Sequence, residues 1–188
     1  SRLYREMGLA TRLRDDAQPM KATRVAQGAA SRWLWHARAA IADERAMDAY
    51  LAECAERGTR RVYAYLESDA RLIDDAQQAE RLALFIDRCA GRDIEVWGLM
   101  GEPEWLDDDG EAELARGAQR LAAFNRRFAA FAPRLAGLKL DIEPHSLPAW
   151  GRDGAAREAL AGRWIALLAA ARAELPALPL WADCPAQY

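Results

Sequence analysis

A lysine and two carboxylates alternate with aliphatic residues in the segment 137–143, which reads Gly-Leu-Lys-Leu-Asp-Ile-Glu. In a β-strand, this alternation sends Lys139, Asp141 and Glu143 to one face and the aliphatic residues to the other. Asp141 and Glu143 would then lie ~6.6 Å apart along the strand, so Asp141 can sit one layer below Glu143 and orient it. We expect Lys139, one layer deeper, to neutralise Asp141. This arrangement suits acid–base chemistry with Glu143 as the general acid.

Other predicted strands also end in acidic and aromatic residues. Tyr65 and Glu67 share a face at the end of the second strand, Glu102 follows the third, and Trp181 and Asp183 share a face in the fifth. Carboxyl ends of parallel strands meet at one edge, so these side chains are expected to cluster. The same rim should hold Trp35, His36, Trp105, His145 and Trp150. Carboxylates interleaved with flat rings are what the hydrolysis of a sugar polymer requires.

Strand-type and helix-type patterns alternate through most of the chain. Period-two or continuous apolar runs predict five strands, at 33–37, 61–67, 94–100, 138–143 and 178–184. Helical stripes between N-cap residues and glycine or proline stop signals predict four helices, at 43–58, 75–91, 110–131 and 155–175.

This alternation predicts an α/β fold of parallel strands with right-handed crossovers. We expect a partial TIM-type (β/α) barrel over 31–188, preceded by an N-terminal leader at 1–30 that is loosely structured or forms one helix. A full barrel needs ~250 residues, so its C-terminal units are expected to be missing, and the open sheet edges could support self-association. An open doubly wound sheet is the alternative fold.

The segment around Asp141 and Glu143 resembles the end of the DGxDxDxE signature of chitinase-type glycoside hydrolases (family 18). The match covers Gly137, Asp141 and Glu143, whereas Ala136 and Lys139 stand where that family has aspartates. The resemblance implies a glycoside hydrolase-like barrel in which Glu143 donates the proton and Asp141 supports it. Glu143-Pro144 and Glu102-Pro103 also resemble the Glu-Pro part of the Asn-Glu-Pro motif of the large retaining-glycosidase clan, without its asparagine.

Bulk composition excludes several classes of partner. The net charge is −3 with both signs interspersed, which argues against a nucleic-acid surface, and no apolar run is long enough to span a membrane. No Gly-rich nucleotide-binding motif occurs, so we expect no cofactor. The expected partner is a carbohydrate, and the glycosidase resemblance favours a secreted, bacterial-type, extracytoplasmic protein.

Two other functions fit the same residues. The first is a non-catalytic half-barrel that binds or guides a polysaccharide through its aromatic rings. The second is a metal-dependent barrel enzyme that uses Asp141, Glu143 and His145, whose oxygen and nitrogen atoms suit manganese or zinc. The substrate, the linkage and the stereochemical outcome stay open at this point, and an isolated half-barrel is expected to be inactive.

Overall fold

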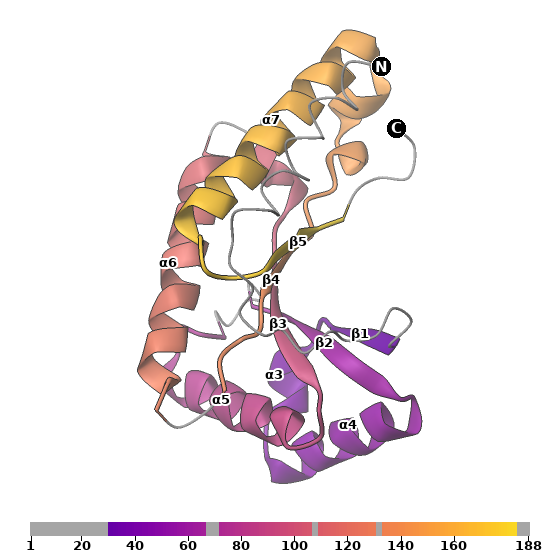
Figure 1. The fold of residues 1–188 in the computed structure, drawn as a ribbon. Coiled ribbons are helices and arrows are strands. Elements are labelled where there is room, and N and C mark those ends of the chain that lie inside the picture. Colours follow the sequence, from indigo (N-terminus) through magenta and orange to yellow (C-terminus); the bar gives the residue numbers. More distant parts are fainter. Residues whose placement is uncertain (1–29, 67–71, 107–108, 131–132, 184–188) are drawn as a thin grey trace.

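A computed structural model describes residues 30–66, 72–106, 109–130 and 133–183 of the chain (Figure 1). Its strands are β1 (Ala30–Leu34), β2 (Thr59–Tyr65), β3 (Glu95–Met100), β4 (Leu138–Leu140) and β5 (Leu180–Ala182). Its α-helices are α3 (Ala37–Ala40), α4 (Glu44–Glu56), α5 (Ala76–Ala90), α6 (Gly110–Phe128) and α7 (Gly154–Glu174). Short 3₁₀ helices are η1 (Pro103–Leu106), η2 (Pro144–Ser146) and η3 (Pro148–Gly151).

The five strands form one sheet in which every neighbouring pair is parallel and the spatial order follows the chain, β1-β2-β3-β4-β5. A doubly wound sheet reverses its strand order at a switch point and carries helices on both faces. Here the order never reverses, and one hydrophobic cluster joins one side of the strands to α4, α5, α6 and α7. The α/β fold expected from the sequence is confirmed, and its arrangement is that of a partial (β/α) barrel.

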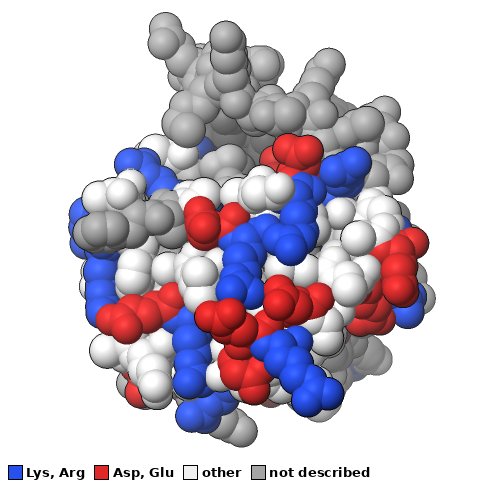
Figure 2. Space-filling model, turned by 90° about the horizontal axis from the view of Figure 1, so that it is seen from below, with Lys and Arg blue, Asp and Glu red and all other residues white. Residues whose placement is uncertain are grey.

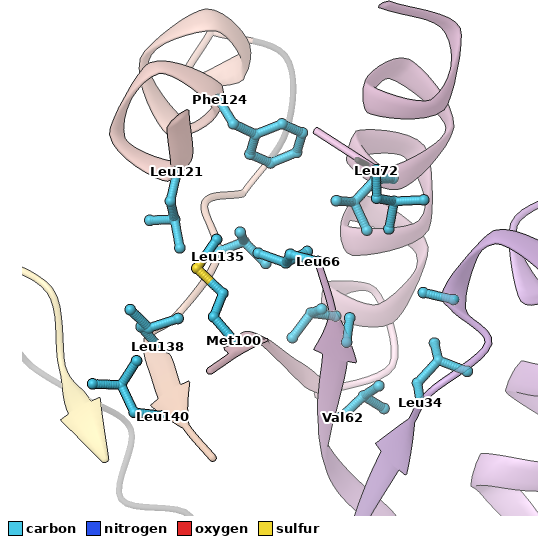
Figure 3. Packing of buried hydrophobic residues seen from close by; sticks show 14 of the residues in the cluster. Leu34, Val62, Leu66, Leu72, Met100, Leu121, Phe124, Leu135, Leu138 and Leu140 are labelled. Carbon is cyan, nitrogen blue, oxygen red and sulfur yellow. The ribbon is translucent and has the colours of Figure 1, made fainter. Parts of the chain in front are cut away.

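The main core lies between the sheet and the helices. Figure 3 shows Met100, Leu138 and Leu140 on the strands and Leu121 and Phe124 on α6, all within this packing. Each of these five side chains is at most 4% exposed. Burial of this aliphatic face fixes the register of the strands, because a shift by one residue would turn the opposite, charged face into the core.

The opposite face of the sheet carries a smaller aromatic cluster. Tyr63, Trp97 and Leu99 are buried there, with Trp33 and Tyr65 packed against them. These residues alternate with the helix-facing residues of their strands, so they correspond to the lumen face of a barrel. We call this side the concave face.

Element boundaries differ from the sequence predictions at several points. β1 begins at Ala30 and ends at Leu34, because the chain turns at Trp35 and His36 into the unpredicted single-turn helix α3. β4 ends at Leu140, although the Asp141 amide still donates a hydrogen bond to the Met100 carbonyl at 2.9 Å. The predicted leader, 1–30, lies outside the described residues except for Ala30.

Helix starts follow the predicted caps in part. The Asp43 and Asp75 side chains accept hydrogen bonds from the amides of Ala46 and Gln78, each at 2.8 Å, at the starts of α4 and α5. Asp109 occupies the N-cap position of α6 without such a bond. These two carboxylates fix where α4 and α5 begin, because each satisfies a backbone amide that would otherwise be unpaired.

Surface charge is mixed in sign. In the view from below, on the side of α4 and α5, acidic and basic side chains alternate (Figure 2). Arg88 illustrates the pattern, since it contacts Glu44 at 3.2 Å and Asp48 at 3.0 Å. Within the described part of the chain, no helix has both the length and the apolar character needed to cross a bilayer.

Glycine is required where β4 begins. A Cβ atom built on Gly137 would lie 2.4 Å from the Trp97 ring, which is itself packed within the concave-face cluster. We expect Gly137→Ala to lower the free energy of unfolding by about 1–3 kcal/mol, because the rigid ring must move. Urea denaturation measures this.

Gly162→Ala provides the control. Gly162 is exposed on α7, and a Cβ there meets no atom within 4 Å. This change should raise stability by about 0.5–1 kcal/mol, as alanine does in helix interiors. Equal effects of the two substitutions would contradict the packing described for Gly137.

Candidate active site

A cavity of about 260 Å³ opens at the carboxyl ends of β1, β2, β3 and β4. Five of the residues predicted for the site line it together, although they are spread over more than a hundred positions in the sequence, from Trp35 to Glu143. The lining residues are Trp35, Tyr65, Gly101, Glu102, Pro103, Asp141 and Glu143. The parallel sheet therefore brings three carboxylates, a phenol and an indole to one place.

Asp141 is the half-buried carboxylate of this cavity. Its backbone amide continues the β3–β4 ladder by donating to the Met100 carbonyl, so its position is fixed by the sheet. Burial, followed by the negative charges of Glu143 and Asp183, raises the pKa of Asp141 to about 6. Lys139 opposes this rise and Glu102 adds to it. Asp141 therefore holds a proton at a pH far above the usual range of an aspartate.

Glu143 stands further out, with 49% of its side chain exposed. It precedes the 3₁₀ turn η2, in which the Ser146 amide and hydroxyl both contact the Glu143 carbonyl oxygen, at 3.0 and 2.8 Å. Its Oε2 lies 4.0 Å from Nε2 of His145, which is also largely exposed. Pro144 starts the turn and directs the chain away from the strand.

Lys139 pairs with Asp183, whereas the sequence predicted a pair with Asp141. Its Nζ lies 3.0 Å from Asp183 Oδ1, and the side chain is only 9% exposed. The ammonium also lies 4.0 Å from the centre of the Trp33 ring and 4.6 Å from that of Tyr63. The register between the strands explains this, because Lys139 pairs with Trp181, and Asp183, two residues further on, follows on the same face.

Glu102 is held by Tyr65. The Tyr65 hydroxyl donates a hydrogen bond to Glu102 Oε1. The Glu102 carbonyl accepts the Trp105 amide at 3.0 Å, which ties the glutamate to η1. Sequence spacing placed Tyr65 and Glu102 at one rim without indicating that they pair.

Gly101 and Pro103 are lining residues that the sequence analysis missed. Gly101 has φ +120°, and a Cβ there would lie 2.8 Å from Ile142 Cγ1 and 3.2 Å from the Asp141 nitrogen. Glycine thus allows the end of β3 to approach the end of β4. The position of Gly101, between an apolar strand and the acidic Glu102, was the sequence feature that could have indicated its place at the site.

The other predicted aromatic and histidine residues lie elsewhere. Trp105 and Trp150 are 9% and 8% exposed and belong to the helix-side core, so neither ring offers a face to a ligand. Trp181 is 48% exposed but sits away from the cavity lining, with its ring 4.6 Å from Arg61 and 5.2 Å from Trp97. His36 is exposed and caps α3, outside the lining.

Trp35 is the exposed ring at the cavity itself. It is 46% exposed and stacks on Trp33, with ring centroids 5.3 Å apart and an interplanar angle of 16°. The Tyr65 ring also contacts it, with ring centroids 5.4 Å apart and tilted by 55°. A ring supported from behind and open in front suits stacking against an apolar face of a ligand. Glu67 lies outside the described residues.

Metal ligation was the second alternative. Across residues 30–66, 72–106, 109–130 and 133–183, no three His, Cys, Asp or Glu side chains come together in a way that could hold a metal ion. Asp141, Glu143 and His145 therefore do not form the ligand set that their spacing suggested. Pro144 and the 3₁₀ turn that follows are the physical reason, since they break the strand alternation.

The raised pKa of Asp141 has a consequence for stability. The folded state binds this proton more tightly than the unfolded state does, so folding loses stability as the pH rises from about 4 to 6. Asp141→Asn should therefore stabilise the protein by about 1–2 kcal/mol at pH 7.5. Each unit of pKa shift corresponds to ~1.4 kcal/mol, and the expected value is smaller than the full shift would give because solvent partly reaches the carboxylate. Below pH 4 the difference between variant and parent should vanish.

Urea denaturation at pH 3.8 and pH 7.5 measures both differences. A stabilisation of the same size at the two pH values would show that burial of a charged Asp141 is not its cause.

Comparisons with protein-family models, with curated proteins and with solved structures found no match to this chain.

Proposed function

We propose that this chain is a glycoside hydrolase-like domain that cleaves an oligosaccharide or polysaccharide at the cavity formed by the ends of β1 to β4. The observation that carries the proposal is the convergence of Asp141, Glu143 and Glu102 with Tyr65 and the exposed ring of Trp35 in one cavity. Acid-catalysed cleavage of a glycosidic bond needs a proton donor, a second carboxylate and a flat surface for the sugar. All three types of group line this cavity.

Asp141 is the better proton donor of the two β4 carboxylates. A general acid works best when its pKa lies near the working pH, and burial together with neighbouring charge brings the pKa of Asp141 to about 6. Glu143 is half exposed, and its charge helps to keep the proton on Asp141. The proposal therefore exchanges the roles that the sequence resemblance assigned to these two residues.

In this scheme each group has one task. The Asp141 carboxyl protonates the glycosidic oxygen as the bond to the anomeric carbon breaks. Glu143, at the rim, bears the negative charge that sets the proton affinity of Asp141 and accepts hydrogen bonds from sugar hydroxyls. Trp35 stacks on the apolar face of one sugar ring, supported by Trp33 behind it.

A non-catalytic, carbohydrate-binding half-barrel is the competing function. It is favoured by the amount of exposed indole on the concave side, where Trp35 and Trp181 are 46% and 48% exposed. Under this alternative the carboxylates only bind hydroxyl groups, and the chain releases no product from any sugar polymer.

Turnover separates these functions. The sequence alone predicted an inactive half-barrel, but the convergence of three carboxylates in one cavity leads us to expect activity. We expect the chain to release reducing ends from a panel of chito-, cello- and xylo-oligosaccharides, and Asp141→Asn to lower kcat by ~100-fold or more because the proton donor is lost. Glu143→Gln should retain measurable activity but move the alkaline limb of the pH–rate profile to lower pH, since a negative charge beside Asp141 is removed.

Glu104→Gln is the matched control. Glu104 is exposed on η1, two residues from Glu102 and outside the cavity lining, so its activity and pH profile should equal those of the parent. Loss of turnover in Glu143→Gln with only a pH shift in Asp141→Asn would return the acid role to Glu143. Binding detected by tryptophan fluorescence, with no turnover in any protein, would favour the non-catalytic function.

A further inference from the structure

We propose that Glu102, held by Tyr65, is the nucleophile of this site, so that the described strands supply both catalytic carboxylates of a double-displacement reaction. This inference rests on the proposed function and adds a covalent step to it. From the sequence, Glu102 was expected only as one of the carboxylates at the rim, without a catalytic step of its own.

The first support is where Glu102 stands. It follows β3 directly and lines the same cavity as Asp141, which follows the neighbouring strand β4. Gly101 brings the two strand ends together, because any side chain there would meet the backbone of Asp141 within 3.3 Å. Acid and nucleophile therefore face one cavity from adjacent strands.

The second support is how firmly Glu102 is held. The Tyr65 hydroxyl donates to Oε1 from the end of β2, and the backbone carbonyl accepts the amide of Trp105, whose ring is buried in the helix-side core. A nucleophile that is already fixed near its attack position reacts faster, because the entropy cost of positioning it does not add to the barrier of the reaction step. The Glu143 carboxylate, by contrast, is 49% exposed on the rim, and among the described residues its side chain approaches only His145, at 4.0 Å.

The two carboxyl groups also differ in environment in the way a double displacement requires. Asp141 holds its proton up to a pH of about 6, whereas Glu102 accepts a hydrogen bond from a phenol. The Lys139 ammonium forms an ion pair with Asp183 and contacts two aromatic rings, so it does not compete with Glu102 as a nucleophile.

The chemical steps balance without a further reactant. Glu102 Oε2 attacks the anomeric carbon while the bond to the leaving oxygen breaks and Asp141 passes its proton to that oxygen. A water molecule then adds to the anomeric carbon of the glycosyl-enzyme, gives a proton to Asp141 and releases the Glu102 carboxylate. The anomeric configuration is retained, because the carbon is displaced twice.

Covalent labelling tests this assignment directly. The chain is incubated with 2,4-dinitrophenyl 2-deoxy-2-fluoro-β-glucoside, digested, and analysed by mass spectrometry. We expect one fluoroglycosyl group on the peptide that contains Glu102, and no label in Glu102→Gln. Label on Asp141 or Glu143, or turnover without any label, overturns the assignment while leaving the hydrolase proposal standing.

Chemical rescue gives a second readout. Glu102→Ala should lower kcat by ~100-fold or more on 2,4-dinitrophenyl β-glucoside, and added azide should restore release of dinitrophenol with formation of a glycosyl azide. A purely structural role for Glu102 would not produce that adduct. Tyr65→Phe should lower kcat by roughly 10- to 100-fold with KM changed less than twofold, since only the position of the nucleophile is disturbed.

Glu104→Ala is the control for both experiments, and it should behave as the parent. Failure of the parent chain to turn over or be labelled by these glucosides and by the oligosaccharide panel overturns the proposed function together with this inference. Normal turnover by Glu102→Ala overturns the inference alone.

Discussion

The Lys139–Asp183 ion pair is the interaction on which the concave side of this protein depends. It joins β4 to the residue that follows β5, at 3.0 Å, and a nearly buried ammonium needs such a partner because an unpaired interior charge is expensive. The faces of Trp33 and Tyr63 complete its surroundings by cation–π contact. Because Lys139 pairs with Asp183, its charge offsets only part of the effect of burial and of the neighbouring carboxylates, which together raise the pKa of Asp141.

A second, partly buried cation extends this pattern toward the other end of the strands. The Arg61 guanidinium lies 4.6 Å from the ring centroids of both Trp97 and Trp181, and two of its nitrogens donate to Glu95 Oε2. The concave face is therefore a layer of aromatic rings with paired cations among them. Such a layer is half polar, so it can face solvent or a sugar polymer in a way that an aliphatic core face cannot. The helix-side face cannot be exposed in this way, because its aliphatic residues must be buried under the helices.

The cavity combines rigidity with access. Its floor is set by backbone contacts between strand ends, through Gly101 and the Asp141 amide, and its walls are set by the Tyr65–Glu102 hydrogen bond and the stacked pair Trp33–Trp35. Glu143 and His145, by contrast, lie on the 3₁₀ turn after the sheet and are largely exposed. The groups to which we assign catalytic steps therefore follow the strands directly, and the rim groups lie on the 3₁₀ turn. Self-association through the edges of β1 and β5, and a location outside the cytoplasm, stay predictions.

The sequence by itself determined the parallel α/β fold and the faces of the strands. Period-two alternation assigned Tyr63, Tyr65, Lys139 and Asp141 to the side away from the helices, because a register slip would bury their charges and expose leucine. Local signals also placed most helices to within three residues. Only the tertiary structure decided the partners. Lys139 pairs with Asp183 and not with Asp141, Trp105 and Trp150 pack into the core, and Tyr65 binds Glu102. Those contacts depend on the register between neighbouring strands and on loop conformation, which bring together residues tens of positions apart. Neither of these produces a periodic pattern in the sequence from which the contacts could be predicted.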